Sequence, residues 1–137
     1  MEVDPLKLRE SDRFYIKRYP DALFFGEVER NPMNKVIRQG AGVMRYRNGR
    51  VFEGDWDDDV RHGRGFERYV NGNTYQGEYK YGKAHGKGIY KWAQGGEVYD
   101  GEWMVGLKQG YGVWRGLFGD SYIGEWNQSK AEGYGVH

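Results

Sequence analysis

Large and small residues alternate along most of this chain, with the period of two that is typical of β-strands. In residues 74–80, which read Thr-Tyr-Gln-Gly-Glu-Tyr-Lys, both tyrosines and the glycine share one face of a strand, and the glutamine and glutamate share the other. A turn signal follows at 81–83, and residues 86–92 predict a second strand. The segment therefore predicts a β-hairpin of two short strands.

The same hairpin pattern occurs about five times, beginning at positions 24, 52, 75, 99 and 122. Each copy opens on a variant of aromatic-x-Gly-acid-aromatic and carries a Gly-x-Gly pair further along. A fixed period in this range indicates a repeat architecture, in which one hairpin cannot bury a face without its neighbours. The sequence therefore predicts an all-β fold, a single-layer antiparallel meander of tandem β-hairpin repeats, elongated and twisted. Aromatic rings packed over strand glycines would supply its thin core.

The repeat boundaries follow from the starting positions of the pattern. We expect units at 24–51, 52–74, 75–98, 99–121 and 122–137, the last of them partial. The first unit carries about five extra residues, which predict a longer hairpin loop. Upstream, residues 13–23 predict a degenerate half repeat that acts as a cap, and residues 1–12 predict a flexible leader. Because the chain stops in the middle of a unit, it ends either in a natural edge strand or, as we favour, within a longer array of which it is a piece.

The amino-acid composition says little more about the fold, but it excludes several classes of function. The chain has 21 Lys and Arg against 20 Asp and Glu, whereas nucleic-acid readers and simple polybasic membrane binders show a clear basic excess. Cysteine is absent, which excludes disulfides and thiolate sites. No apolar run approaches the ~18 residues of a membrane span, and the N-terminus does not resemble a secretory signal. We expect a cytoplasmic protein with no nucleic-acid partner.

Two short motifs suggest metal binding, but the repeat explains them better. His62 and His85 occupy the same position in successive units, where equivalent residues lie roughly 9–10 Å apart, too far for one zinc ion. The acidic run at 55–59 imitates the start of a calcium loop. Such a loop needs Gly and Glu where this chain has Val60 and Phe66. We therefore expect no metal site and no cofactor.

A catalytic role finds little support in the residues. One carboxylate per repeat forms a column, and roughly 9–10 Å between repeats marginally exceeds the ~5–9.5 Å of a glycosidase dyad. The members of this acidic column are Glu27, Asp55, Glu78, Glu102 and Glu125. Residues 82–88 are similar to a phosphate loop but lack the Ser or Thr that follows Gly-Lys. We expect no enzyme activity.

A column of cations occupies one equivalent position in four successive units. Its members are Arg45, Arg68, Lys91 and Arg115. The column could bind a run of phosphates or an acidic peptide. It could equally pair with the acidic column on a neighbouring strand, which is the interpretation that we favour, because opposite charges across strands attract.

A column of aromatic residues is the best binding candidate. Its members are Phe52, Trp56, Tyr75, Tyr79, Tyr99, Trp103, Tyr122 and Trp126. Because no second layer covers both faces of a single sheet, we expect some of these rings to stay partly exposed, and exposed apolar patches usually mark an interaction site. Alternatively the rings pack only on one another and on glycine. Both can hold together, with the ladder serving as core and as groove floor.

Residues 75–88 resemble the MORN repeat, the "membrane occupation and recognition nexus" motif, almost position by position. Its pattern is Tyr-x-Gly-Glu-Trp, two residues, and then Gly-Lys-x-His-Gly-x-Gly. The resemblance covers residues 24–137, and the first unit departs most, with Val28 in place of the second aromatic residue. Gly116 also stands where other units have an aromatic residue. The resemblance implies a hairpin array with an aromatic-lined groove and a role in attachment to a partner protein, a membrane or both.

Three functions remain open at this point. The first is a scaffold or adaptor whose groove takes an extended or helical segment of a partner protein and helps attach it to a membrane or the cytoskeleton. The second is a module that binds phosphoinositides or an anionic membrane through the basic column. The third is a targeting or regulatory arm of a larger enzyme, such as a lipid kinase. An uncovered strand edge also predicts self-association.

Overall fold

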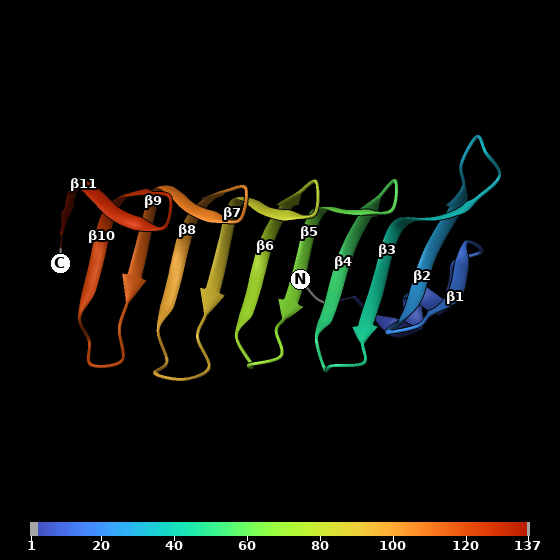
Figure 1. Cartoon of the computed structure of the whole chain (residues 1–137), viewed down its shortest axis with the longest axis horizontal. Helices are drawn as coiled ribbons and strands as arrows, with labels where there is room; N and C mark the ends of the chain where they lie inside the picture. The colour runs from blue at the N-terminus through green and yellow to red at the C-terminus, as the bar shows by residue number, and fades with distance from the viewer. Residues whose placement is uncertain (1–2, 137) are drawn as a thin grey trace.

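The computed structural model describes the backbone of residues 3–136 and the side chains of residues 3–129. The strands lie side by side in chain order and form one elongated layer (Figure 1). The sheet has 11 strands, ordered β1 to β11, and every neighbouring pair is antiparallel. The predicted single-layer meander of tandem hairpins is confirmed.

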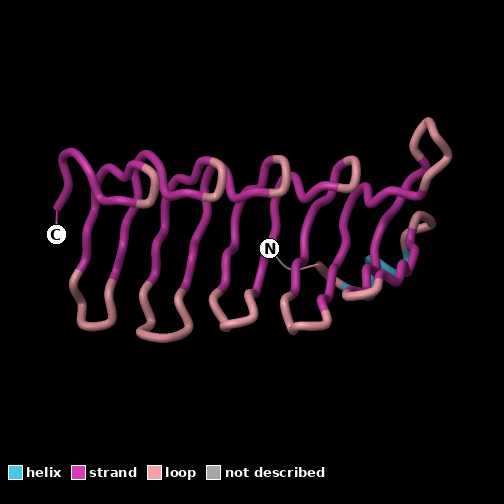
Figure 2. The backbone as a smooth tube through the Cα atoms, viewed as in Figure 1, coloured by secondary structure: helices cyan, strands magenta, loops and turns pink. Residues whose placement is uncertain are grey.

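The elements follow the repeat closely. They are α1 (Pro5–Glu10), β1 (Phe14–Tyr19), β2 (Ala22–Arg30), β3 (Val36–Tyr46), β4 (Val51–Asp57), β5 (Val60–Arg68), β6 (Thr74–Lys80), β7 (Lys83–Lys91), β8 (Val98–Met104), β9 (Leu107–Arg115), β10 (Ser121–Asn127) and β11 (Lys130–Val136). In Figure 2 the turns within hairpins form a row along the top, and the loops between hairpins form a row along the bottom.

The turns within the hairpins are tight and left-handed. At the β6–β7 turn, Tyr81 and Gly82 have φ of 50° and 80°, and at the β8–β9 turn Val105 and Gly106 have φ of 49° and 80°. Positive φ at both central residues matches the right-handed twist of the flanking strands, as in a type I′ turn. The first hairpin is longer, since β2 ends at Arg30 and β3 begins only at Val36.

Each hairpin contains a bulge that explains the acidic column. In β6 and β7, the register shifts between Gly77 and Tyr79, and Gly86 in the bulge has φ of 81°. The carboxylate of Glu102 accepts a hydrogen bond from the backbone N–H of Tyr111 at 2.7 Å, and equivalent bonds reach Glu27, Asp55 and Glu78. The acidic residue therefore satisfies the backbone that the bulge frees from the ladder.

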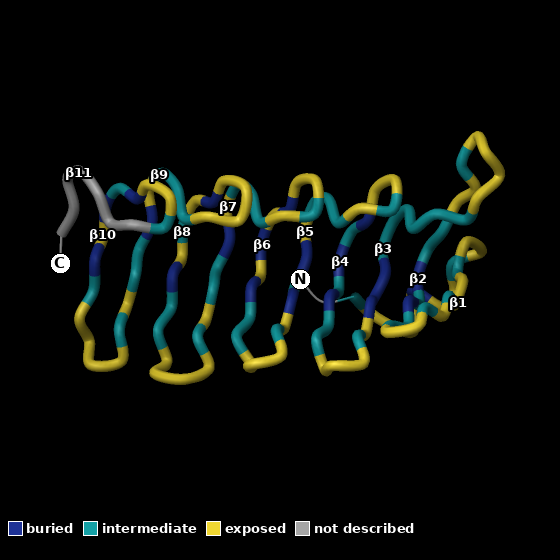
Figure 3. Tube along the Cα trace, in the orientation of Figure 1, coloured by how far each residue is buried: buried dark blue, intermediate teal, exposed yellow. Residues whose placement is uncertain are grey.

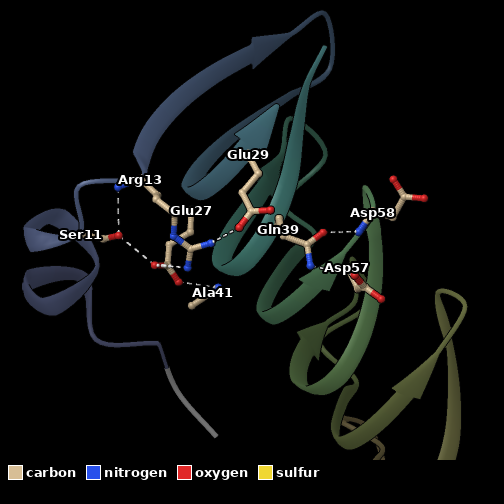
Figure 4. A network of polar contacts seen from close by, with 8 residues as sticks. All are labelled: Ser11, Arg13, Glu27, Glu29, Gln39, Ala41, Asp57 and Asp58. Atoms are coloured by element: carbon tan, nitrogen blue, oxygen red, sulfur yellow. Dashed lines mark hydrogen bonds and ion pairs between the residues drawn. The ribbon is translucent and has the colours of Figure 1, made fainter. Parts of the chain in front are cut away.

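Glu27 shows this arrangement most fully (Figure 4). One carboxylate oxygen accepts from the backbone N–H of Ala41 at 2.9 Å, and the other accepts from the hydroxyl of Ser11 and from Arg13. Hydrogen bonds to the charged form and the charge of Arg13 together outweigh burial, so the pKa of Glu27 lies below its usual value. The network connects the chain before β1 to the first complete hairpin.

The core lies on one face of the sheet, which we call the inner face. Ring contacts run without a break from Phe24 to Tyr122, with centroids 5.2–5.6 Å apart and the rings near perpendicular. Buried stretches accordingly follow the strands, while the loops are exposed (Figure 3). A Cβ added to Gly88 would lie 2.5 Å from the ring of Tyr75, so only glycine leaves room for the ring.

The N-terminal segment contains one short helix. Residues Pro5–Glu10 form α1, because the side chain of Asp4 caps the first turn and accepts from the N–H of Leu6 at 3.0 Å. Leu8 is buried, which gives this short helix a packed side chain. Strand β1 falls within the expected half repeat at 13–23 and pairs with β2 from Phe14↔Glu27 to Tyr19↔Ala22.

Candidate functional site

The eight aromatic residues of the candidate column all lie in the core. Their exposed fractions range from 0% for Phe52 and Tyr99 to 8% for Trp103 and Trp126. The expectation that some of them stay partly exposed is wrong. Each ring is covered by the perpendicular ring of its own or the next hairpin, so the column closes on itself within a single layer. These residues support a binding surface from beneath.

A second set of rings lies above this core and remains half-buried. It comes from the second strand of each hairpin and the residue after it, and comprises Tyr46, Tyr69, Tyr90, Trp92 and Trp114. Tyr90 stacks between Tyr69 and Trp92, with ring centroids 5.8 and 4.6 Å away. Sequence reasoning noted that aromatic residues recur here but did not include them in the site. Their periodic recurrence was the signal that could have found them.

A groove opens on the inner face where these half-buried rings meet the hairpin turns. Its deepest part is a hollow of about 320 Å³. The aromatic lining includes Tyr69, Tyr90 and Trp103, and Ala84 lies among these rings. The turn residues Gly82, Val105 and Gly106 also border the hollow. The arrangement is a shallow aromatic-lined groove over a rigid floor, the concave apolar surface that a ligand segment needs.

One buried carboxylate lies in the wall of the groove. Glu67 is 2% exposed, forms ion pairs with Arg50 and Arg61, and accepts a hydrogen bond from the hydroxyl of Tyr79 at 2.9 Å. Burial, with the nearby charge of Glu67, raises the pKa of Tyr69 to about 12. Because a buried charge is costly without partners, this network is sensitive to the loss of either arginine. Sequence reasoning missed Glu67, since the other units have Met44, Tyr90 and Trp114 at its position.

Cations cover the rings at one inner-face position of the second strand. The guanidinium carbon of Arg38 lies 4.7 Å from the ring centroid of Trp56, and that of Arg61 lies 5.2 Å from Phe52. The ammonium of Lys108 lies 4.7 Å from Trp126, and burial lowers its pKa. The sequence pattern did not reveal this row, because each cation pairs across its hairpin with Val or Trp rather than with an acid.

The sequence model of the MORN repeat matches residues 52–74, 75–97, 99–116 and 122–137. The chain belongs to the MORN repeat family. A comparison with curated proteins found no match. MORN repeats are associated with binding to membranes or partner proteins, and the family is generally non-catalytic. The matched segments begin at residue 52, after the unit in which Val28 replaces the second aromatic residue.

The outer face of the MORN array carries the basic column. The register adds Arg18 to the row, because Arg18 and Arg45 both pair with Leu23. Arg68 stands opposite Thr74 and Val51, not opposite an acid. Arg68, Lys91 and Arg115 form no ion pair with any residue that the structure describes. The favoured pairing of the basic and acidic columns is therefore wrong, since the carboxylates lie at the bulge and bind backbone N–H groups.

The remaining sequence candidates show no chemistry of their own. The ring of His62 lies edge-on to Tyr81 with centroids 5.8 Å apart. Across the part of the chain with placed residues, no group of three His, Asp or Glu side chains is arranged to hold a metal ion. In the same part of the MORN array, no helix is long and apolar enough to cross a bilayer.

Proposed function

We propose that this MORN array is a non-catalytic adaptor that holds a polypeptide segment of a partner protein in its inner-face groove and helps attach that partner to a membrane or the cytoskeleton. One observation carries the proposal. The half-buried rings of Tyr69 and Tyr90 and the edge of the core residue Trp103 line an open groove above a floor that is already packed. Tyr and Trp are the residues that dominate binding hot spots, because they bury much area at little entropic cost.

The groove predicts how such a complex behaves. Its contact surface is mainly aromatic, so affinity should depend weakly on salt, unlike that of a complex held by exposed charges. Trp92 is the best residue to test, because it is half-buried, contacts the groove residue Tyr90 with ring centroids 4.6 Å apart, and lies outside the fully buried column. Tyr111 offers a matched control, since it is an exposed aromatic residue on the outer face.

The test is selection of peptides from a displayed random library against the intact chain, followed by calorimetry on the enriched peptides. Trp92→Ala should weaken them by at least about tenfold, the loss typical of a hot-spot aromatic residue, while Tyr111→Ala leaves affinity unchanged. Thermal unfolding of both variants checks that they remain folded. Enriched peptides that bind Trp92→Ala as tightly as the parent chain would exclude the groove as the binding surface.

The outer face supports a second candidate function, binding to an anionic membrane. Arg18, Arg45, Arg68, Lys91 and Arg115 form one exposed row at intervals of two strands, roughly 9–10 Å. Cations with this regular spacing suit a surface of many anionic head groups rather than one compact ligand. The near-neutral net charge of the chain counts against strong binding.

Co-sedimentation with phosphoinositide-containing vesicles at low and physiological salt separates the two candidates. If the row binds membranes, replacing Arg68 and Lys91 by serine should abolish sedimentation. Replacing Arg64 and Lys87, two exposed cations in a different outer-face row, should change it little. Equal losses with both pairs would indicate non-specific attraction, and no sedimentation of the parent chain at physiological salt would remove the membrane candidate.

A further inference from the structure

The row of inner-face cations is interrupted in unit 75–98. Arg38, Arg61 and Lys108 occupy equivalent positions, each paired across the hairpin with the second core residue of its unit. In unit 75–98 the same position is Ala84, which pairs with Tyr79. Three units therefore place a long cationic side chain over the core rings, whereas unit 75–98 places a methyl group there. The last unit also has alanine at this register position, since Ala131 pairs with Trp126.

Lys108 shows what the complete arrangement looks like. Its ammonium nitrogen lies 5.4 Å from the ring centroid of Tyr99, 5.2 Å from Trp92 and 4.7 Å from Trp126. These rings come from the same unit, from the end of the preceding unit and from the following unit. All three distances fall within the ~6 Å at which a ring face attracts a cation. Lys108 is thus held by three rings from three successive hairpins.

The corresponding three rings surround Ala84. One repeat earlier, Tyr75 stands for Tyr99, Tyr69 for Trp92 and Trp103 for Trp126, and all three line the hollow of about 320 Å³ that borders Ala84. The ring centroids of Tyr75 and Trp103 are 5.4 Å apart, so these two rings already contact each other beside the hollow. The hollow lies where the aliphatic stem of a lysine or arginine would run if position 84 carried the same kind of residue as the equivalent positions 61 and 108.

We infer that the hollow above Ala84 accepts a lysine or arginine side chain from the bound partner polypeptide. The inference rests on the proposed function of the groove and specifies the chemistry of its ligand. The aliphatic stem would fill the space that Ala84 leaves, and the charged group would lie over the rings of Tyr75 and Trp103, since Arg50 already lies over the ring of Tyr69. The partner segment supplies the cation that this repeat lacks.

Charges around the hollow define what kind of cation fits. Glu67 lines it, but the two cations Arg50 and Arg61 already pair with this single carboxylate. The exposed Lys83 also lines the hollow, and the guanidinium carbon of Arg50 lies 5.8 Å from the ring centroid of Tyr69. The attraction must therefore come from the ring faces and not from a free acid. Ring faces favour the weakly hydrated guanidinium over a compact ammonium, so arginine should bind better than lysine.

A small probe tests the hollow without any partner. We would titrate N-acetyl-arginine amide into the isotope-labelled chain and follow the Ala84 methyl and the Trp103 indole N–H by NMR. Arginine should give saturable shifts at both groups, and the neutral isostere N-acetyl-citrulline amide should bind roughly tenfold more weakly. Equal shifts with both probes would show an apolar hollow with no preference for cations and would overturn the inference.

A substitution within the chain provides the second test. Ala84→Arg should fill the hollow, abolish the probe shifts and raise the melting temperature above that of Ala84→Met, which fills the space without charge. Ala93→Arg, at an exposed loop position, controls for added charge. An Ala84→Arg chain that melts like Ala93→Arg and still binds the probe would contradict the inference.

The outcomes separate the two proposals. Library peptides that bind Ala84→Arg as tightly as the parent chain would overturn the cation site and leave the groove intact. The opposite result is probe shifts at Ala84 together with no library peptide whose affinity falls in Trp92→Ala. It would contradict the polypeptide-binding function on which the inference rests.

Discussion

Strand β6 shows the contrast between the two faces of this sheet within seven residues. On the inner face Tyr75 and Tyr79 are 1% and 5% exposed, whereas on the outer face Gln76 and Glu78 are exposed to solvent. The inner residues contact rings of neighbouring hairpins, whereas the Glu78 carboxylate accepts a hydrogen bond from the backbone N–H of Lys87 in its own hairpin. Ring contacts between repeats therefore lie on the inner face. The outer-face carboxylate instead forms a hydrogen bond with the backbone at the bulge of its own hairpin.

The two faces also carry different candidate functions, polypeptide binding on the inner face and membrane binding on the outer face. Despite its close packing, the inner face has a groove that is lined by half-buried rings and by Ala84. The outer face keeps a regular row of cations that the acidic column does not neutralise. A repeat protein is stabilised by repeats and by the interfaces between them. Inner-face substitutions should accordingly reduce stability much more than outer-face ones.

The strongest test of this difference is Phe52→Ala. Phe52 is fully buried and contacts the rings of Trp56 and Tyr79, so its removal should lower the free energy of unfolding by about 3–5 kcal/mol. Urea unfolding measures the loss. Phe66→Ala, on the outer face of β5 and only half-buried, is the matched control and should cost clearly less. Equal losses would contradict the assignment of the core to one face.

A smaller loss should follow from Gly88→Ala. The added Cβ would lie 2.2 Å from the hydroxyl of Tyr75, so the ring must move, at a cost of about 1–3 kcal/mol in unfolding free energy. The loss should shrink in a chain that already carries Tyr75→Ala, because the clash is then absent. Additive losses in that double-mutant cycle would show that ring packing is not the reason for the glycine.

Alkaline pH should weaken the inner face selectively. Burial raises the pKa of Tyr99 to about 12, above the usual value of about 10 that applies once the chain unfolds. The neutral folded form is thus favoured, and its contribution is complete below pH 10 and is lost as the pH rises from 10 to 12. Urea unfolding across this range should show falling stability, with a shallower fall in Tyr99→Phe. An identical slope in the variant would rule out Tyr99 as a source.

The smallest effect is expected on the outer face. Arg68→Ser removes an exposed cation that has no ion pair with a described residue, so unfolding free energy should change by no more than about 0.5 kcal/mol. Arg61→Ser, on the inner face, removes a partner of the buried Glu67 carboxylate and should be far more damaging. Similar melting temperatures for the two variants would contradict the claim that inner-face substitutions reduce stability more than outer-face ones.

The sequence alone determined the repeat, the hairpins and the register. Alternation with a period of two decides which side chains share a face, and a slip of one residue would expose the whole aromatic set. The second glycine of a Gly-x-Gly pair aligns with the glycine of the next aromatic-x-Gly-acid-aromatic motif, as Gly65↔Gly77 and Gly88↔Gly101 show. The MORN resemblance rests on the same periodic positions and is confirmed by the family match.

Only the tertiary structure decided which residues remain available for binding. The aromatic column looked half-exposed because burial of Tyr75 depends on Trp103 from the next hairpin, a contact that no local pattern contains. The acidic and basic columns looked like partners, but the bulge moved the carboxylates onto backbone N–H groups. The missing cation at Ala84 leaves a hollow only because the fold brings rings from three hairpins together around this residue. Periodicity specifies the face of a side chain, whereas its exposure depends on neighbours that the fold supplies.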